Sequence, residues 1–483
     1  MSATVPETRG TEFRGLGGAA TTLAPEALAA FRAAFRGPLL FPADPGYDET
    51  RMIWNAMIDR RPALIARCTG TADVVAAVRF ARQHGLLSSV RGGGHNIAGL
   101  AVVDGGLMID LSLMKGVWVD PEARVAHAQG GCTLGDLDRE TQLHGLAAPL
   151  GFVSETGIAG LTVGGGFGYL SRSLGWTCDN LVSMEVVTAD GTLHRASDTE
   201  NDELFWCLRG GSGNFGIVTS FAYRLFPVGP EIVGGAVVWK GEDAAQVLDF
   251  YRDFTSTAPR ELTAVAVLRF APPAPWLPKD IHGKPIIAIF ACWSGQDLAE
   301  GEKLVRPLKT FGAPVADILV RRPFVQMQSL LDATQPKGRR YYWKSEYLAE
   351  LEPDLLRGVV ERAARIPSPF GAVILFHIGG ALNELGADHS PAGNRDAAFV
   401  LNITASWEKP PDDGANVAWA RETWNALKRF STGGAYINFM TEDEGADRTR
   451  AAYSAANLER LAALKKTYDP DDFFRHTKGL GGG

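Results

Sequence analysis

Three consecutive glycines form the centre of the most informative segment of this chain, Arg91-Gly92-Gly93-Gly94-His95-Asn96. The apolar run from Leu86 to Val90 precedes it and predicts a buried strand. Glycines after a strand leave successive backbone N–H groups uncovered, and such a concavity can hold a diphosphate. Arg91 would add positive charge. For an isolated motif of this kind, a tight turn that carries a surface histidine is the competing interpretation.

Strand and helix patterns alternate on both sides of this segment. Leu64 to Ala66 predicts a strand, and Thr71 to His84 predicts a helix that ends at a glycine. A further strand is expected at Leu107 to Leu111. Nearer the N-terminus, a helix should begin at Pro25 and end before Gly37, because proline favours the first helical turn and glycine the position after the last. Residues 1–20 lack a period and are expected to fray.

A formal GxGxxG motif at Gly211, Gly213 and Gly216 suggests a nicotinamide-binding Rossmann unit. That unit requires a strand before the motif and a helix after it, so that the helix N-terminus meets the pyrophosphate. Here Glu203 to Leu208 predicts a helix, whereas the β-branched and aromatic residues Ile217 to Phe221 predict a strand. The order is reversed, and the Rossmann interpretation is therefore rejected.

Pro227, Gly229 and Pro230 mark a boundary, beyond which apolar segments alternate with amphipathic helices and predict one sheet covered by helices. In the tail, Tyr436 to Phe439 predicts a short strand, and a helix should end at Asp469. The expected parts are an N-terminal extension and helix (1–45), a first domain (46–230), a second domain (231–430) and a C-terminal segment (431–483).

The composition excludes several classes of protein. The 483 residues carry a net charge of −7 and show no basic stripe, which argues against a nucleic-acid or anionic-membrane partner. No stretch resembles a membrane helix or a signal peptide, so a cytoplasmic protein is expected. The five cysteines are widely spaced without a CxxC pair, which predicts neither a metal site nor a disulfide framework.

Together, these motifs resemble those of a known family. In chain order they are the glycine–histidine segment at 91–95, Asp110-Leu111-Ser112, the glycine-dense stretch 157–168, Asp179-Asn180, 186–191 and 208–218, followed by a Tyr-x-Asn motif at 436–438 and a DP-x-x-FR ending at 469–475. The chain is similar to the flavin-linked oxidases of the vanillyl-alcohol oxidase superfamily, in particular to the berberine-bridge-enzyme-like branch. The resemblance extends from about Tyr47 to His476.

This resemblance implies a two-domain α+β fold of the PCMH type, in which the C-terminal segment completes the FAD-binding domain. His95 takes the place of the histidine that the family joins to FAD, and the cysteine of a second link is replaced by Val153. A single covalent attachment through His95 is therefore expected. The cofactor-binding residues implied are Arg91, Gly92, Gly93, Gly94, His95, Asn96, Gly99, Asp110, Ser112, Thr156, Gly157, Gly160, Gly164, Gly165, Gly168, Asp179, Asn180, Gly216, Ile217, Val218, Tyr436 and Asn438.

The substrate side is less well defined by the sequence. By resemblance, Asn402 lies on the strand that faces the flavin ring, but an acid and a base of plant relatives are replaced by Val400 and Phe439. A base would then be supplied by Tyr436, by His377 or from elsewhere. An unperturbed tyrosine is a poor base at neutral pH, and His377 lies between apolar neighbours typical of a core or pocket-lining position. Trp54, Tyr341 and Tyr342 are candidates for an aromatic pocket, or for the core.

The implied activity is that of an FAD-dependent oxidoreductase. It would oxidise a small alcohol, amine or phenolic metabolite by hydride transfer to flavin N5, and dioxygen would reoxidise the flavin to give hydrogen peroxide. Thr156 stands where a small side chain in the family lets dioxygen reach the ring. The alternatives are a dehydrogenase or oxidative cyclase that uses dioxygen poorly, and a flavin-binding module without activity. A monomer or a homodimer is expected.

Overall fold

The strand before the glycine segment lies at the edge of a small sheet. In spatial order the strands are β3 (Leu39–Leu40), β4 (Leu64–Arg67), β6 (Leu107–Asp110) and β5 (Ser88–Arg91). β4, β6 and β5 run parallel, and α3 (Thr71–Gln83) forms the crossover from β4 to β5. The structure is a computed structural model and describes residues 11–480.

An N-terminal hairpin and helix pack on the same core. The hairpin consists of β1 (Thr11–Arg14) and β2 (Ala20–Leu23), and it is followed by α1 (Pro25–Ala34) and α2 (Tyr47–Arg51). Phe31 of α1 stacks on Phe80 of α3 at 4.2 Å between ring centroids. The prediction that residues 1–20 fray is thus wrong for 11–20, because Phe13 and Leu23 of the hairpin bury their side chains in this core; residues 1–10 lie outside the described part.

A second, antiparallel sheet completes the N-terminal half. Its strands, in spatial order, are β11 (Leu193–Ser197), β10 (Leu181–Val187), β12 (Ile217–Arg224), β8 (Val125–Gln129) and β7 (Val117–Asp120). This half of the chain also contains the helices α4 (Leu134–Thr141), α5 (Ile158–Val163), α6 (Ser171–Leu174) and α7 (Asp202–Leu208), and β9 (Leu146–Ala147) pairs with β13 (Phe226–Pro227). α7 precedes the GxGxxG motif and β12 follows it, which confirms the reversed order that excludes a Rossmann unit.

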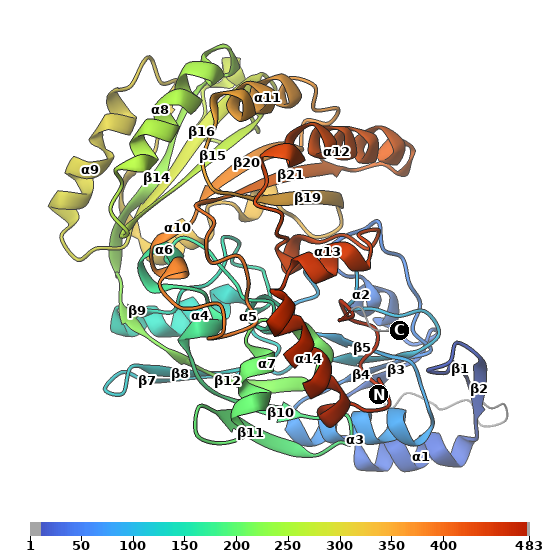
Figure 1. Cartoon of the computed structure of the whole chain (residues 1–483). Coiled ribbons are helices and arrows are strands. Elements are labelled where there is room, and N and C mark those ends of the chain that lie inside the picture. Colours follow the sequence, from blue (N-terminus) through green and yellow to red (C-terminus); the bar gives the residue numbers. More distant parts are fainter. Residues whose placement is uncertain (1–10, 481–483) are drawn as a thin grey trace.

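The second half is one large sheet with helices on one face (Figure 1). Its strands, in spatial order, are β17 (Ala316–Asp317), β14 (Glu231–Lys240), β16 (Pro285–Trp293), β15 (Leu262–Phe270), β20 (Ala372–His377), β21 (Phe399–Trp407) and β19 (Arg340–Leu348), and β18 (Val320–Pro323) also pairs with β14. The covering helices are α8 (Ala244–Ser256), α9 (Leu298–Thr310), α11 (Pro353–Ala363) and α12 (Asp413–Leu427), whereas α10 (Phe324–Gln328) is a short connection.

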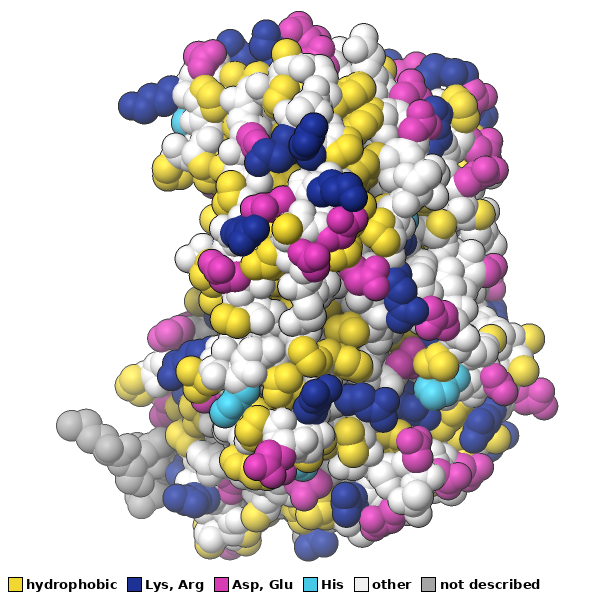
Figure 2. Space-filling model, turned by 90° about the vertical axis from the view of Figure 1, so that its left-hand side faces the viewer, with side chains coloured by type: hydrophobic (Ala, Val, Ile, Leu, Met, Phe, Trp, Pro, Cys, Tyr) yellow, Lys and Arg dark blue, Asp and Glu magenta, His cyan; other side chains and the backbone are white. Residues whose placement is uncertain are grey.

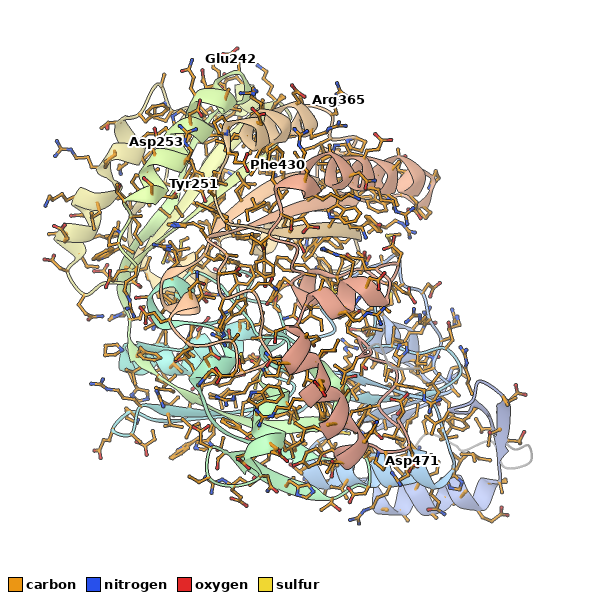
Figure 3. The ribbon with its side chains drawn as sticks, viewed as in Figure 1. Glu242, Tyr251, Asp253, Arg365, Phe430 and Asp471 are labelled. Carbon is orange, nitrogen blue, oxygen red and sulfur yellow. The ribbon has the colours of Figure 1, made fainter. Side chains whose placement is uncertain are left out.

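Tyr251 shows how these helices are fixed to the sheet. It points from α8 toward the strands (Figure 3), and its hydroxyl lies 3.1 Å from the carbonyl oxygen of Ala264 and 3.0 Å from that of Leu375. The opposite face of the sheet carries the aromatic and polar side chains discussed below. The large sheet therefore presents one face to its helices and the other to the N-terminal half.

The C-terminal segment returns to the N-terminal half through α13 (Ala446–Ala451) and α14 (Ala455–Tyr468), and α14 packs beside α7 (Figure 1). Beyond α14, Asp471 forms an ion pair with Arg82 of α3 at 2.7 Å. The predicted strand at 436–439 is wrong: Ile437–Phe439 is a 3₁₀ turn, closed by a hydrogen bond from Phe439 N to Tyr436 O at 2.9 Å. An extended strand would separate these two groups.

The surface shows no strong segregation of charge on the face in Figure 2, where basic and acidic side chains are interspersed. Within residues 11–480, no helix is long and apolar enough to cross a membrane. All five cysteines are buried and unpaired.

Candidate functional site: a cavity between the two halves

A cavity of about 300 Å³ lies where the glycine segments of the N-terminal half face the large sheet. Several separate regions of the chain reach it. The glycine loops after β5 and before α5 form one end, β20, β21 and β19 form the other, and the turn at 436–439 lies between them. Residues far apart in the sequence thus share one wall.

Two glycine loops form the first end through contact of their backbones. A Cβ atom added to Gly93 would lie 2.5 Å from the Cα of Gly157, so neither position can accept a side chain without moving the other loop. Gly160 differs, because a Cβ there would meet no atom of the protein within 4 Å although Gly160 lines the cavity. These glycines leave room beside bare main chain, which is what the close approach of a ligand requires.

His95 brings an unpaired nitrogen to this cavity. Its Nε2 atom is buried and has no hydrogen-bond partner, and the residue is part of the wall. Burial lowers the pKa of His95 to about 4, so the imidazole is neutral at neutral pH. A buried polar atom without a partner costs free energy, and an atom that bonds to a ligand avoids that cost.

The structure brings most of the predicted cofactor residues into the cavity wall. The predicted residues that line it are Gly92, Gly93, Gly94, His95, Asn96, Thr156, Gly157, Gly160, Gly216, Ile217, Val218, Tyr436 and Asn438. Nine others are absent from the wall: Arg91, Gly99, Asp110, Ser112, Gly164, Gly165, Gly168, Asp179 and Asn180. Their contacts indicate that they support the loops rather than face the cavity.

Arg91, Asp110 and Ser112 fix the strand ends behind the glycine loop. Asp110 is fully buried; it accepts a hydrogen bond from Arg67 at 3.1 Å and two from Ser112, at 2.8 Å from the hydroxyl and 3.0 Å from the backbone N–H. The Arg91 guanidinium donates to the carbonyl oxygen of Thr50. The charge of Arg91 thus serves the protein itself, and the expectation that it adds charge at the cavity is not met by this geometry.

Asp179 connects the two halves of the molecule. Its carboxylate accepts two hydrogen bonds from the Arg395 guanidinium, at 2.7 and 2.9 Å, and one from the Ser390 hydroxyl at 3.1 Å. Asn180 donates to the carbonyl oxygens of Leu174 and Trp176 and so fixes the turn that precedes it. Asp179 and Asn180 thus have structural contacts, and those of Asp179 extend to a loop of the second half.

The remaining predicted glycines are required by packing. A side chain at Gly164 would collide with Asn438, and one at Gly168 with the carbonyl oxygen of Leu150. Gly99 and Gly165 have positive φ angles of 73° and 109°, which L side chains rarely adopt. These positions shape the loops without lying against the cavity.

The rejected GxGxxG segment still contributes to the site. Ser212, Gly213 and Gly216 line the cavity, and Ser212 has a φ angle of 63°, unusual for a residue with a side chain. Such backbone strain clusters at functional sites. His476 and Thr477 of the C-terminal segment line the same end, although no motif in the sequence predicted them there.

Tyr436 lies on the wall with its hydroxyl oxygen already occupied. That oxygen accepts hydrogen bonds from Gly166 N at 3.2 Å and from Asn438 Nδ2 at 3.0 Å. Burial raises the pKa of Tyr436 above its usual value, although these two hydrogen bonds oppose the shift. Tyr436 therefore keeps its proton at neutral pH and is a hydrogen-bond donor rather than a base.

His377 does not line the cavity. Its Nε2 atom lies 2.7 Å from an Arg172 guanidinium nitrogen, and its ring stacks on Phe399 at 5.1 Å. Burial, reinforced by the charge of Arg172, holds the pKa of His377 well below its usual range. Of the two roles considered for His377, the structure contradicts that of the catalytic base: it is a core histidine, because β20 directs it away from the cavity that Ile374 and Phe376 line.

Three polar atoms at the sheet end of the cavity are buried without a partner: Asn402 Oδ1, Trp343 Nε1 and Gln335 Oε1. Asn402 was predicted, whereas Trp343 and Gln335 were missed. The period of two along β19 is a signal for Trp343, because Tyr341 and Trp343 share a face. Nothing local identifies Gln335, which precedes that strand.

The sheet end is otherwise aromatic and uncharged. Phe152, Phe167, Phe376 and Phe439 contribute rings to the wall. Among the described residues that line the cavity there is no Asp, Glu, Lys or Arg. The proposed aromatic pocket thus exists but is formed by other residues than expected: Trp54 and Tyr341 lie behind the wall, and Tyr342 faces Arg421 and Asp443.

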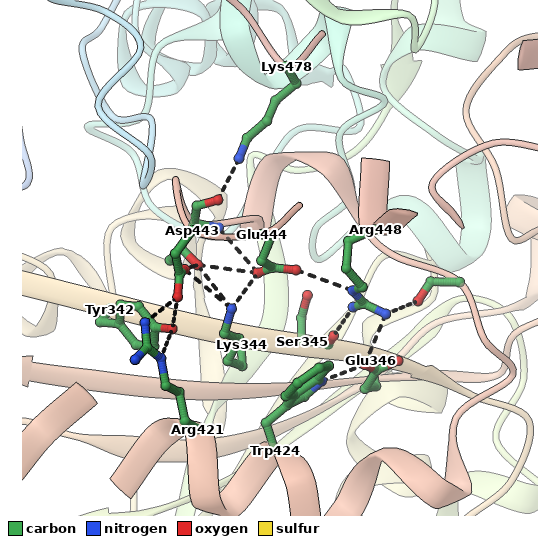
Figure 4. Close-up of polar contacts among 12 residues, drawn as sticks. Tyr342, Lys344, Ser345, Glu346, Arg421, Trp424, Asp443, Glu444, Arg448 and Lys478 are labelled. Atoms are coloured by element: carbon green, nitrogen blue, oxygen red, sulfur yellow. Dashed lines mark hydrogen bonds and ion pairs between the residues drawn. The ribbon is translucent and has the colours of Figure 1, made fainter. Parts of the chain in front are cut away.

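An ionic network holds the C-terminal segment against β19 (Figure 4). Lys344 lies 3.3 Å from Glu444, and Arg448 lies 3.1 Å from Glu346 and 3.2 Å from Glu444. Lys478 donates to the carbonyl oxygen of Thr441 at 2.8 Å, and burial lowers its pKa to about 8. The network fixes the strand that carries Trp343 beside the turn that carries Tyr436.

One departure from the family pattern lies at the cavity: Val153, which replaces the cysteine of a second link, is part of the wall. Thr156, the small residue at the position for dioxygen access, also lines it. Cys178 is fully buried outside the wall, and burial raises the pKa of its thiol well above the usual value. It behaves as a small packing residue.

Bare glycine loops, an unpaired imidazole nitrogen and an uncharged aromatic end fit a long cofactor with a diphosphate and a flat ring. The residues present thus fit FAD, and the class of protein is an FAD-linked oxidoreductase. The sequence matches the FAD binding domain family over residues 62–197 and the berberine and berberine-like family over residues 435–481.

Proteins that match most of this chain indicate the same class. The chain is 31% identical to (R)-6-hydroxynicotine oxidase of Paenarthrobacter nicotinovorans, over 92% of this chain and 96% of that protein, and 30% identical to an FAD-linked oxidoreductase of Dictyostelium discoideum, over 88% and 90%. The crystal structure of 6-hydroxy-D-nicotine oxidase from Arthrobacter nicotinovorans superposes with a TM-score of 0.82 at 28% identity, covering 92% of this chain and 98% of that one. The chain belongs to the berberine-bridge-enzyme-like family and has its two-domain α+β PCMH-type fold.

Proposed function

We propose that this protein oxidises a small, uncharged organic molecule with a single covalently attached FAD as electron acceptor. When bound, the FAD would accept hydride at N5 and pass the two electrons to dioxygen, giving hydrogen peroxide. The glycine loops at 92–94 and 157–160 would hold its diphosphate and leave main chain against it. His95 would form the covalent link, since Val153 replaces the second attachment residue.

The observation that carries this proposal is that His95 lines the cavity and that its buried Nε2 atom has no hydrogen-bond partner. The low pKa of His95, about 4, leaves the lone pair of the imidazole available at neutral pH. A structural histidine at a tight turn would instead be expected to pair both nitrogens with protein or water.

The chain's own residues favour a substrate that carries no net charge. A charged group would lose its hydration in a cavity whose wall offers no opposite charge, which is costly. The aromatic side chains of the sheet end offer contact area for a ring, and Trp343 Nε1 and Asn402 Oδ1 offer one donor and one acceptor. Neutral alcohols, amines and phenols fit this description.

Proton removal is not assigned to a protein base. Tyr436 is protonated at neutral pH and His377 lies outside the wall. The Tyr436 hydroxyl has filled its acceptor positions and can donate its proton toward the cavity. We propose that Tyr436 orients the substrate by this hydrogen bond. The O–H or N–H proton of the substrate would be lost to water, so that the oxidation would need no protein base.

Acid precipitation of the purified protein tests the tether. Yellow colour that stays in the pellet of the wild type, and that is released in His95→Ala, is the expected result. The matched control is His127→Ala, because His127 is an exposed histidine on β8. Colour that washes out of the wild-type pellet, or that stays with His95→Ala, contradicts the single link through His95.

Anaerobic addition of neutral alcohols, amines and phenols, followed by stopped-flow mixing with air, tests the activity. Bleaching by at least one compound and rapid recovery in air are expected of an oxidase. Bleaching with slow recovery would favour the dehydrogenase or oxidative cyclase, and the absence of any bleaching would favour a flavin-binding module. The described residues of the cavity wall include no carboxylate, and this observation supports the last alternative.

We further propose a cytoplasmic location, which the five buried, unpaired cysteines support because reducing compartments keep thiols free. Cell fractionation with a tagged chain tests it, and recovery with an extracytoplasmic fraction would contradict it.

A further inference from the structure

Three aromatic rings stack in a row behind the proposed attachment residue. The ring of His95 lies on Trp54 with 4.2 Å between centroids and 18° between planes. Trp54 in turn lies on Tyr341 at 3.7 Å and 12°. Trp54 and Tyr341 are 3% and 1% exposed, and neither lines the cavity. They lie behind the wall, where Trp54 contacts two residues that line the cavity, His95 and Trp343.

Trp54 is held from both halves of the molecule. Its backbone N–H donates to the carbonyl oxygen of Gly94 at 3.0 Å, next to His95. Its indole Nε1 donates to the carbonyl oxygen of Gln335 at 2.8 Å, and its own carbonyl oxygen accepts from Gly338 N at 3.0 Å. Gln335 and Gly338 belong to the second half, so the position of Trp54 depends on the docking of the two halves.

Tyr341 is fixed in a similar way. Its hydroxyl donates to the carbonyl oxygen of Pro336 at 2.6 Å, and its backbone N–H and C=O both pair with the side chain of Asn55, at 3.0 Å each. Asn55 follows Trp54 directly in the chain and also donates to the carbonyl oxygen of Ile97. The start of β19 and the loop that carries His95 thus both form hydrogen bonds with the dipeptide Trp54-Asn55.

The His95 ring needs such a support. The Cβ–Cγ torsion of histidine is broad, so packing or hydrogen bonds must select the plane of the ring. Nε2 has no partner and cannot supply that restraint. The flat face of Trp54, stacked on the imidazole with 18° between planes, is the contact that restrains the ring plane of this cavity-lining histidine.

We propose that Trp54 is a positioning residue for covalent attachment of the flavin, and that Tyr341 makes the attachment depend on the docked second half. This inference rests on the tether proposed above. Attachment would break one C–H bond of the flavin 8α-methyl group and the N–H bond of the imidazole, and would form one bond between that carbon and Nε2. The two electrons and two protons remain on the flavin until dioxygen takes them up as hydrogen peroxide.

The experiment compares the rate of attachment with the affinity for FAD. Flavin-free wild type, Trp54→Leu and Trp54→Phe are mixed with FAD, and samples are precipitated with acid at intervals to measure the covalent fraction. Trp118→Leu is the matched control, because Trp118 also contacts a histidine ring, His127 at 5.4 Å, but is 60% exposed on the edge strand β7. Reversible binding of FAD is followed separately by quenching of flavin fluorescence.

In Trp54→Leu we expect attachment about tenfold slower or more, since small errors in the placement of a reacting atom have effects of this size. FAD affinity should change less than threefold. Trp54→Phe, which keeps a flat ring, should recover most of the rate, and Trp118→Leu should equal the wild type. If Trp54→Leu attaches FAD at the wild-type rate, the proposal is overturned.

Trp54 lies in the core, so near-ultraviolet circular dichroism of each variant checks that it folds. If Trp54→Leu does not fold, Tyr341→Leu decides, because it leaves Trp54 in place and removes only the outer ring of the stack. We expect a clear slowing there, with Tyr341→Phe close to wild type, and an unchanged rate in Tyr341→Leu overturns the proposal. If wild type binds FAD and never attaches it, the tether itself fails, and this inference fails with it.

Discussion

The two ends of the cavity are built from different parts of the chain. At the flavin end, backbone atoms of two glycine loops form the wall, and the two loops contact each other so closely that neither Gly93 nor Gly157 has room for a Cβ. At the sheet end, side chains form the wall, among them Trp343, Phe376 and Asn402 from three neighbouring strands. The flavin end depends on positions that lack a side chain, whereas the sheet end depends on which side chains are present.

This difference explains how freely the residues at each end of the cavity can be substituted. A backbone wall recognises groups shared by all users of one cofactor, and a single added side chain blocks it. A side-chain wall can be changed one residue at a time without altering the fold, which suits a family whose relatives include oxidases of 6-hydroxynicotine and of xylooligosaccharides. Substitutions at the two ends should therefore have different effects on cofactor binding and on substrate binding.

The largest effect is expected at the ion pair that joins the two halves of the molecule. Asp179→Asn removes the charge that pairs with Arg395, whose side chain is 5% exposed, and leaves a buried guanidinium without a counter-charge. Loss of one partner of such a pair costs about 3–5 kcal/mol. Chemical unfolding should show a loss of this size.

Asp253→Asn is the control for that experiment. Asp253 pairs with Arg252 at 3.0 Å on the surface and is 71% exposed (Figure 3), where an ion pair contributes about 0–1 kcal/mol. Equal stability losses in Asp179→Asn and Asp253→Asn would show that the docking of the loop at 389–395 does not depend on the buried pair.

The next effect concerns the flavin end alone. Gly160→Leu places a side chain where no protein atom lies within 4 Å of the new Cβ, so the chain should fold normally while the cavity is partly filled. We expect the FAD affinity to fall on the order of 100-fold. Titration with FAD measures it. Gly414→Leu, at an exposed glycine of α12 with equally open surroundings, should bind FAD as the wild type does.

The difference between the flavin end and the sheet end also determined what could be predicted from the sequence. Glycine runs are visible in the chain, and the strands expected at Leu64 to Ala66 and at Leu107 to Leu111 are observed at Leu64–Arg67 and Leu107–Asp110. The sheet end depends on which strands become neighbours and on their register, which no local pattern specifies. Trp343 was missed although Tyr341 and Tyr342 were considered. Asp110 and Asp179 were predicted at the cofactor because their motifs are recognisable, but they hold the loops from behind.

His377 allows a test of that distinction by pH. Its pKa in the folded protein is held well below the usual value of about 6.5, so between these two values the unfolded chain binds a proton that the folded protein does not. The free energy of unfolding should therefore fall as the pH is lowered below about 6.5. His377 alone contributes up to about 1.4 kcal/mol per pH unit over part of this range.

In His377→Gln this part of the acid sensitivity should disappear, while the flavin is still reduced by substrate at a wild-type rate. Denaturant unfolding at several pH values and anaerobic stopped-flow reduction provide the two measurements. A variant that keeps the full acid sensitivity contradicts the assigned pKa direction. Loss of flavin reduction in a folded variant would instead restore His377 as a candidate base.

The smallest effect is expected at the sheet end. Trp343→Phe keeps an aromatic ring in the wall and its edge contacts with Trp54 and Phe439, but it removes the buried Nε1–H group. If that group donates to the substrate, KM for a substrate with a matching acceptor should rise about fivefold with kcat unchanged, since one neutral hydrogen bond contributes about 1 kcal/mol. If it pairs with nothing in the complex, the substitution removes an unsatisfied donor, so KM stays constant and the protein becomes slightly more stable. Steady-state kinetics together with thermal unfolding distinguish the two results, and the first would show that the sheet end selects its ligand by single side-chain atoms.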